Sequence, residues 1–250
     1  MKLTMKYSLL ALAGLAWTSA AHAGLITASE VATGGQSASA GGATFSAYAN
    51  TEATIASTLA SKHIPGIGTG LGVNGYGNTE IDWYATPHGG NSELLRVTLA
   101  DASYVHDLTL GLLFDGPEYG DYLERANFRV RFADGSSGQY TLAALFGGGY
   151  NTALWGGGGN WVSSGLWNGG AGLWVNSDPF AGRAVRSFDM FAPPGSCGVS
   201  SGCWDQSDFV FRSMRTTSVP EPGTLALFAV ALAGLALARR RRSQPVRAAA

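Results

Sequence analysis

The sequence is poor in charged side chains and contains no common catalytic signature in its expected structural context. Asp, Glu, Lys and Arg make up 13% of its 250 residues, whereas 36 residues are glycine. A His-Glu-x-x-His pair and a Walker loop are missing. The strings Gly-x-Ser-x-Gly (residues 198–202) and Gly-x-Gly-x-x-Gly (residues 70–75) do occur, but without the strand–turn–helix pattern that a nucleophile elbow or a dinucleotide fingerprint requires. A surface with so little charge is unusual for a cytosolic enzyme and common among secreted β-rich proteins. The composition therefore favours a secreted, non-enzymatic protein.

Basic residues are scarce in the middle of the chain. Between Gly24 and Thr217 there are 9 Lys and Arg against 16 Asp and Glu, a net charge of −7. Lys62 is the only lysine of this segment, so its glycine-rich runs lack the lysine that a phosphate loop needs. An acidic body cannot displace the counterions of a phosphate backbone in bulk. These features exclude nucleic acid as a partner.

The first 23 residues have the three parts of a secretory signal peptide. Lys2 and Lys6 form a charged start, Ser8 to Trp17 form a short apolar core, and Ala21 to Ala23 supply small residues before the cleavage site. The apolar run is too short to remain as a membrane anchor. We expect the Sec translocon to export the chain and signal peptidase to cut after Ala23, so that the mature protein begins at Gly24.

The C-terminal end combines a proline-rich motif, an apolar helix and a basic cluster. In the motif, residues 219–223, prolines fix φ and push their predecessors toward extended conformations, which gives a stiff, exposed strip. Fifteen uncharged residues follow, Thr224 to Ala238, and a helix of this length spans about 22 Å. The arginines at 239–242 are expected to stay in the cytoplasm, which leaves the rest of the chain outside.

This C-terminal arrangement resembles the PEP-CTERM sorting signal. The matching residues are Val219, Pro220, Glu221 and Pro222, the transmembrane helix 224–238, and the basic stop Arg239, Arg240, Arg241 and Arg242. The resemblance implies that residues 218–250 are a transient anchor in the inner membrane, which an exosortase cuts at or near the motif. It also implies that the mature protein goes to the cell surface or the extracellular matrix.

The segment 24–217 is predicted to be an exported all-β domain. Residues 126–132 alternate between apolar and polar, and a Gly- and Ser-rich turn leads into a returning strand, which indicates a hairpin. Inward-facing leucines recur in 95–99 and 105–114, and residues 185–191 and 207–214 give two more strands. Helical periodicity is weak, with residues 52–62 as the single candidate helix. Short strands without a βαβ rhythm favour an antiparallel β-sandwich or jelly roll.

Two sets of uncommon residues stand out in this domain. Cys197 and Cys203 are the only cysteines and lie in the exported part, where a disulfide between them is expected. Residues 147–174 hold eleven glycines and a tryptophan every six or seven residues. These rings are either core or a platform that stacks on sugars. The tryptophans are Trp155, Trp161, Trp167 and Trp174.

Carboxylates supply the remaining candidate chemistry. Two oxygen-rich clusters are predicted as Ca²⁺ sites, with a solvated acidic loop as the alternative for each. One cluster is Asn78, Glu80 and Asp82, and the other is Asp115, Glu118 and Asp121. A carboxylate pair for glycoside hydrolysis could come from Glu80, Asp82, Glu118 and Glu124. The function predicted is therefore a surface or exopolysaccharide-matrix protein, with a secreted polysaccharide hydrolase or a protein-binding adhesin as alternatives.

Overall fold

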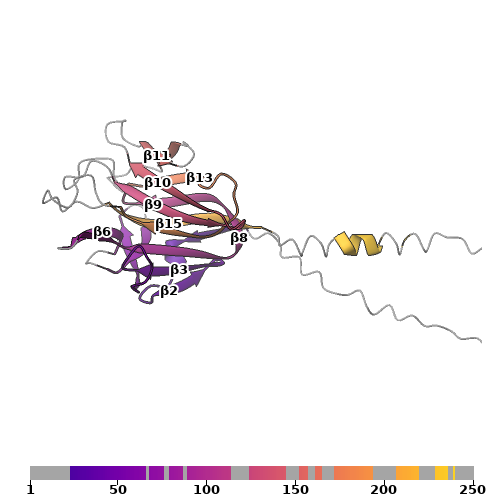
Figure 1. Cartoon of the computed structure of the whole chain (residues 1–250), viewed down its shortest axis with the longest axis horizontal. Coiled ribbons are helices and arrows are strands. Elements are labelled where there is room, and N and C mark those ends of the chain that lie inside the picture. Colours follow the sequence, from indigo (N-terminus) through magenta and orange to yellow (C-terminus); the bar gives the residue numbers. More distant parts are fainter. Residues whose placement is uncertain are drawn as a thin grey trace, which may run out of the picture. The chain divides into compact units, whose positions relative to one another are not determined.

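A computed structural model of the chain (Figure 1) describes residues 23–65, 68–75, 79–86, 89–113, 124–144, 152–156, 161–164, 172–193, 207–219, 229–235 and 239. The chain divides into two units, of which Ala23–Val219 forms the body and Met1–His22 with Pro220–Ala250 forms the other. In the second unit, residues 229–235 are helical, and Val230, Leu232 and Leu235 are exposed. None of the described helices is long and apolar enough to cross a membrane.

The described body is built from β-strands that pair antiparallel, with one short 3₁₀ turn, η1 (Ala28–Glu30). The prediction of an all-β protein is therefore confirmed. The strands are β1 (Ala23–Thr27), β2 (Ser37–Ala40), β3 (Ala43–Tyr48), β4 (Leu59–Ile64), β5 (Gly68–Val73), β6 (Ile81–Thr86), β7 (Gly89–Ser92), β8 (Leu94–Gly111), β9 (Arg125–Phe132), β10 (Ser137–Ala144), β11 (Thr152–Gly156), β12 (Trp161–Ser164), β13 (Trp174–Ser177), β14 (Val185–Phe191) and β15 (Asp208–Ser218).

The predicted hairpin is present as β9 and β10. Phe128, Val130 and Phe132 of β9 are buried, and the residues between them point to the opposite face. Tyr140 of β10 pairs with Phe128 in an antiparallel register. Alternating side chains make a strand that is apolar on one face only, so β9 lies on the core with its polar residues outward.

Strand β8 connects the two halves of the body. Its first half, Leu94 to Leu99, pairs with β3 and β14, whereas its second half pairs with β13 and β15. Phe45 of β3 and Phe211 of β15 meet with ring centroids 5.2 Å apart. Because these two rings come from the separate partner sets of β8, the halves share one apolar core.

The two strands predicted at 95–99 and 105–114 are one continuous strand, β8, that ends at Gly111. An irregularity in its pairing with β15, where Arg215 and Thr216 lie opposite Asp107 and Val105, shifts the inward phase. Leu108 and Leu110 enter the main core, whereas Leu112 packs in a small separate cluster. Phe114 lies outside the described residues.

The helix predicted at 52–62 is wrong. Residues 49–58 form a looped segment with a bridge at Ala56, and β4 begins at Leu59. The Asn50 side-chain oxygen accepts hydrogen bonds from the backbone N–H groups of Thr54 and Ile55, each at 3.0 Å. An asparagine that bonds the backbone ahead of it offers the chain an alternative to helical hydrogen bonds.

The body begins and ends in one antiparallel pair. Strand β1 pairs with β15, and Ala23 lies opposite Thr217. Beyond β15, the N–H of Val219 donates to the carbonyl of Ala102 at 2.7 Å. The two ends of the body therefore leave the sheet from neighbouring positions.

Candidate functional site

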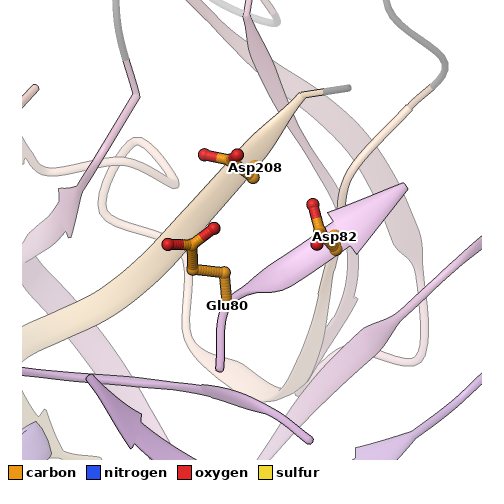
Figure 2. A group of neighbouring side chains, drawn as sticks. All are labelled: Glu80, Asp82 and Asp208. Carbon is orange, nitrogen blue, oxygen red and sulfur yellow. The ribbon is translucent and has the colours of Figure 1, made fainter. Parts of the chain in front are cut away.

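Three carboxylates come together where β6 pairs with β15. Asp82 of β6 lies directly opposite Asp208 of β15, and Glu80 precedes β6 with the phase of Asp82. One oxygen of each side chain lies within 4.8 Å of the others. Figure 2 shows the three side chains gathered from these two segments. Directly opposite residues of an antiparallel pair point to the same side, and this register creates the cluster.

The cluster is shielded from solvent. Glu80 is 3% exposed and Asp82 is 5% exposed, and Asp208 is partly buried. Lys62 of β4 forms an ion pair with Glu80. Glu93, which is fully buried, accepts a hydrogen bond from the N–H of Asp82 at 3.1 Å. Buried carboxylates of like charge are costly unless a cation or a proton compensates them, and Lys62 brings one positive charge to this cluster.

These oxygens have the chemistry that Ca²⁺ prefers, because calcium takes carboxylate and carbonyl oxygens in flexible geometry. The structure brings Glu80 and Asp82 together, as the sequence pattern predicted, and adds Asp208. No local signal points to Asp208, because its place depends on the pairing of segments far apart in the chain. Asn78 and the second predicted cluster, Asp115, Glu118 and Asp121, lie outside the described residues. Calcium binding stays a prediction.

His106 and Asp107, a possible base and acid, are neighbours on β8. The side chain of His106 bonds to Thr217 through Nε2 and Oγ1 at 2.8 Å, whereas Asp107 contacts Ser177 and Arg215. A base and its orienting acid need to bond to each other, and these two neighbours have separate partners. Glu124 is buried, and Glu118 lies outside the described residues.

Trp174 is part of the core. It is 3% exposed, lies on β13 opposite Leu110, and donates its indole N–H to the carbonyl of Leu113. A ring in this position cannot stack on a sugar. Trp174 therefore cannot belong to the predicted carbohydrate-binding platform. The backbones at Trp155 and Trp161 belong to β11 and β12, but their side chains, and the whole of Trp167, lie outside the described residues.

The C-terminal segment follows directly on the last strand of the body. Strand β15 ends at Ser218, and Val219 is held by its bond to Ala102. Residues 218–242 match the family model for the PEP-CTERM protein-sorting motif. The chain carries a PEP-CTERM signal. This confirms the resemblance carried by Val219 to Pro222 and by the arginines that follow.

The PEP-CTERM motif implies an exported protein that is anchored transiently in the membrane and processed by an exosortase. The match covers the tail and leaves the body unassigned. Comparisons with curated proteins and with solved structures found no match. Pro220, Glu221, Pro222 and the predicted disulfide partners Cys197 and Cys203 lie outside the described residues.

Proposed function

We propose that this chain is a non-enzymatic protein delivered to the cell surface or the exopolysaccharide matrix, where its β-rich body associates with carbohydrate. The observation that carries the proposal is the PEP-CTERM motif at residues 218–242, placed immediately after the last strand of a compact body. A sorting signal that is cleaved off is useful only if the rest of the protein can function without it, so the function is expected to lie in the body.

The construction of the body suits removal of the tail. The last strand ends at Ser218, and Val219 contributes the last backbone bond of the described body. Cleavage beyond Val219 would leave the pairing of β15 with β1, β5, β6 and β8 intact. We therefore expect the processed protein to keep the stability of its body.

Carbohydrate association is supported by the polar character of the sheet face that points away from the core. On β2 and β3 this face carries short hydroxyl side chains, and Ser39 bonds to Thr44 through their hydroxyl oxygens at 2.9 Å. Hydroxyl, amide and guanidinium groups match the hydrogen-bonding pattern of sugars. A hydrolase would instead need two carboxylates open to the substrate. Glu80 and Asp82 are 3% and 5% exposed, so these two carboxylates support the non-enzymatic proposal over the hydrolase alternative.

The proposal is tested by substituting the motif in cells that contain an exosortase. Pro220→Ala with Pro222→Ala removes the stiffness of the strip, and Pro245→Ala, outside the matched residues, is the control. We expect the wild type and the control in the surface or matrix fraction, and the motif variant in the inner membrane. Digestion of the matrix polysaccharide should then release the sorted protein. Equal sorting of the motif variant, or retention after digestion, would overturn the proposal.

A further inference from the structure

A basic groove lies on the outer face of the sheet, the side of β8, β14, β9 and β10 that points away from the core. Its cavity has a volume of about 780 Å³. Four of the nine basic residues between Gly24 and Thr217 line it: Arg96, Arg129, Arg131 and Arg186. Asp189 and Glu52 are the two carboxylates of the lining. The groove is therefore a local excess of positive charge on an acidic body.

Strand register brings three of these arginines onto one face. Arg129 lies opposite Asp189 of β14, and Asp189 lies opposite Arg96 of β8. Arg131 lies opposite Ser187. Since the residues of β9 between Phe128, Val130 and Phe132 point away from the core, these side chains share the outer face.

Arg186 reaches the same face through an irregularity in β14. Val185 lies opposite Phe132 and Ser187 lies opposite Arg131, so Arg186 is an extra residue in this strand. Strict alternation would turn residue 186 into the core, because Phe188 and Met190 are buried. The bulge keeps Val185 buried and leaves Arg186 exposed beside Ser187. The bulge therefore adds a fourth arginine to the groove.

The four arginines divide into a fixed pair and an available pair. Arg96 donates to both oxygens of Asp189 at 2.6 and 3.0 Å, and Arg129 lies 3.6 Å from the same carboxylate. Arg129 also donates to the carbonyl of Thr51. Arg131 and Arg186 are exposed and form no ion pair among the residues that the structure describes. The available pair is free to receive an anion.

Aromatic rings hold the fixed pair in place. The guanidinium of Arg129 lies over Phe191 at 4.9 Å from the ring centroid, and that of Arg96 lies over Tyr48 at 5.5 Å. A cation held against a ring and a carboxylate loses less conformational freedom when a ligand binds beside it. The groove is therefore preorganised on the side of β8 and β9.

We propose that this groove binds an anionic polysaccharide, with the oxyanions of the sugar held by Arg131 and Arg186. Guanidinium forks bind planar carboxylates with two parallel hydrogen bonds, and uronic acids offer one carboxylate on each ring. Ser137 and Gln139, which also line the cavity, offer bonds to sugar hydroxyls. A protein partner would need apolar anchors in the middle of the interface, whereas this lining is mainly Arg, Ser, Gln and Gly. The inference rests on the proposed carbohydrate association. It adds the binding site and the negative charge of the polysaccharide.

The test measures retardation of the full chain, purified in a non-ionic detergent, by gels that contain polygalacturonate or neutral dextran. Arg131→Gln with Arg186→Gln is the groove variant. Arg215→Gln is the matched control, because Arg215 is an exposed arginine outside the lining with a side chain that is 59% exposed. We expect polygalacturonate and not dextran to retard the wild type and the control. The groove variant should bind at least about tenfold more weakly, as expected when charged hydrogen bonds are lost.

The other possible results of this test also support or overturn the proposed groove. Dextran sulfate bound with the same dependence on Arg131 and Arg186 would support the groove and identify sulfate as a second oxyanion that it accepts. Equal binding of dextran, equal retardation of the groove variant, or equal binding of polyglutamate would overturn the assignment. Thermal unfolding of the groove variant is expected to match the wild type, because both side chains are exposed. A protein that sorts to the matrix but does not bind polygalacturonate would remove the groove and leave the proposed function standing.

Discussion

Asp189 contributes both to the stability of the body and to the charge of the groove. The variant Asp189→Asn is expected to change these two properties in opposite directions. Asp189 is 13% exposed at its side chain and accepts two hydrogen bonds from Arg96, whose side chain is 32% exposed. This bond raises the pKa of Arg96 above its usual value, with smaller effects from other causes. An amide at this position cannot receive both donors of the fork and carries no charge to balance Arg96 and Arg129.

The expected loss lies between two limits. Exposed ion pairs contribute about 0 to 1 kcal/mol, whereas removing one partner of a buried pair costs about 3 to 5 kcal/mol. Arg96 and Asp189 are partly exposed and well aligned, so we expect Asp189→Asn to lower the free energy of unfolding by about 2 kcal/mol. For a body of this size, that corresponds to a fall in Tm of about 4 to 8 °C.

Urea denaturation and polygalacturonate binding should change in opposite directions. Stability falls, whereas binding tightens because removing the negative charge of Asp189 makes the groove more positive. Asp101→Asn is the control, since Asp101 is an exposed carboxylate on β8, and its change should stay within about 0.5 kcal/mol. A loss below about 0.5 kcal/mol for Asp189→Asn, or weaker binding by that variant, would refute the reasoning.

The remaining predictions concern the core, a turn and the carboxylate cluster. Phe211→Ala, at a position with 0% exposure, should lower the free energy of unfolding by about 3 to 5 kcal/mol in urea; a loss under about 1 kcal/mol would contradict the shared core. Hydrogen bonds from Ser136 lower the pKa of Asp134 to about 2, from 3.8. The turn should therefore keep this contribution above pH 3.8 and lose it as the pH falls toward 2, and an NMR titration midpoint near 3.8 would be the contrary result. Calcium should raise the Tm of the wild type and not of Asp208→Asn; the same Tm with and without calcium in both proteins would remove the predicted site.

Alternation of side chains made the strands predictable. Residues 126–132 form a strand with the expected inward residues, and residues 185–191 form the expected strand, because alternation with period two is visible in the local sequence. The loop at 49–58 was not predictable in this way, since the side chain of Asn50 replaces helical hydrogen bonds with its own. Composition likewise could not decide between core and surface for Trp174, because burial depends on which strand lies beside it.

The sites depend on contacts between distant segments. Glu80 and Asp82 were predictable from their spacing, whereas Asp208 joins them only through the register of β15 on β6. The groove shows the same limit: Arg129 and Arg131 share a phase within β9, but the bulge that exposes Arg186 becomes visible only when β14 is paired with β9. A single sequence specifies which faces are polar, and the register between strands decides which polar residues meet.

The central claim is that the PEP-CTERM tail is a removable address on an exported β-rich body, and intact-mass spectrometry of the extracellular protein tests it most directly. The account predicts a chain that begins at Gly24, ends near the motif at 219–223 and lacks the apolar segment 224–238. The same spectrum should give a mass two hydrogens lower than the reduced chain, as expected for a disulfide between Cys197 and Cys203. A protein that stays in the cytosol and retains both residues 1–23 and 224–250 would contradict the account.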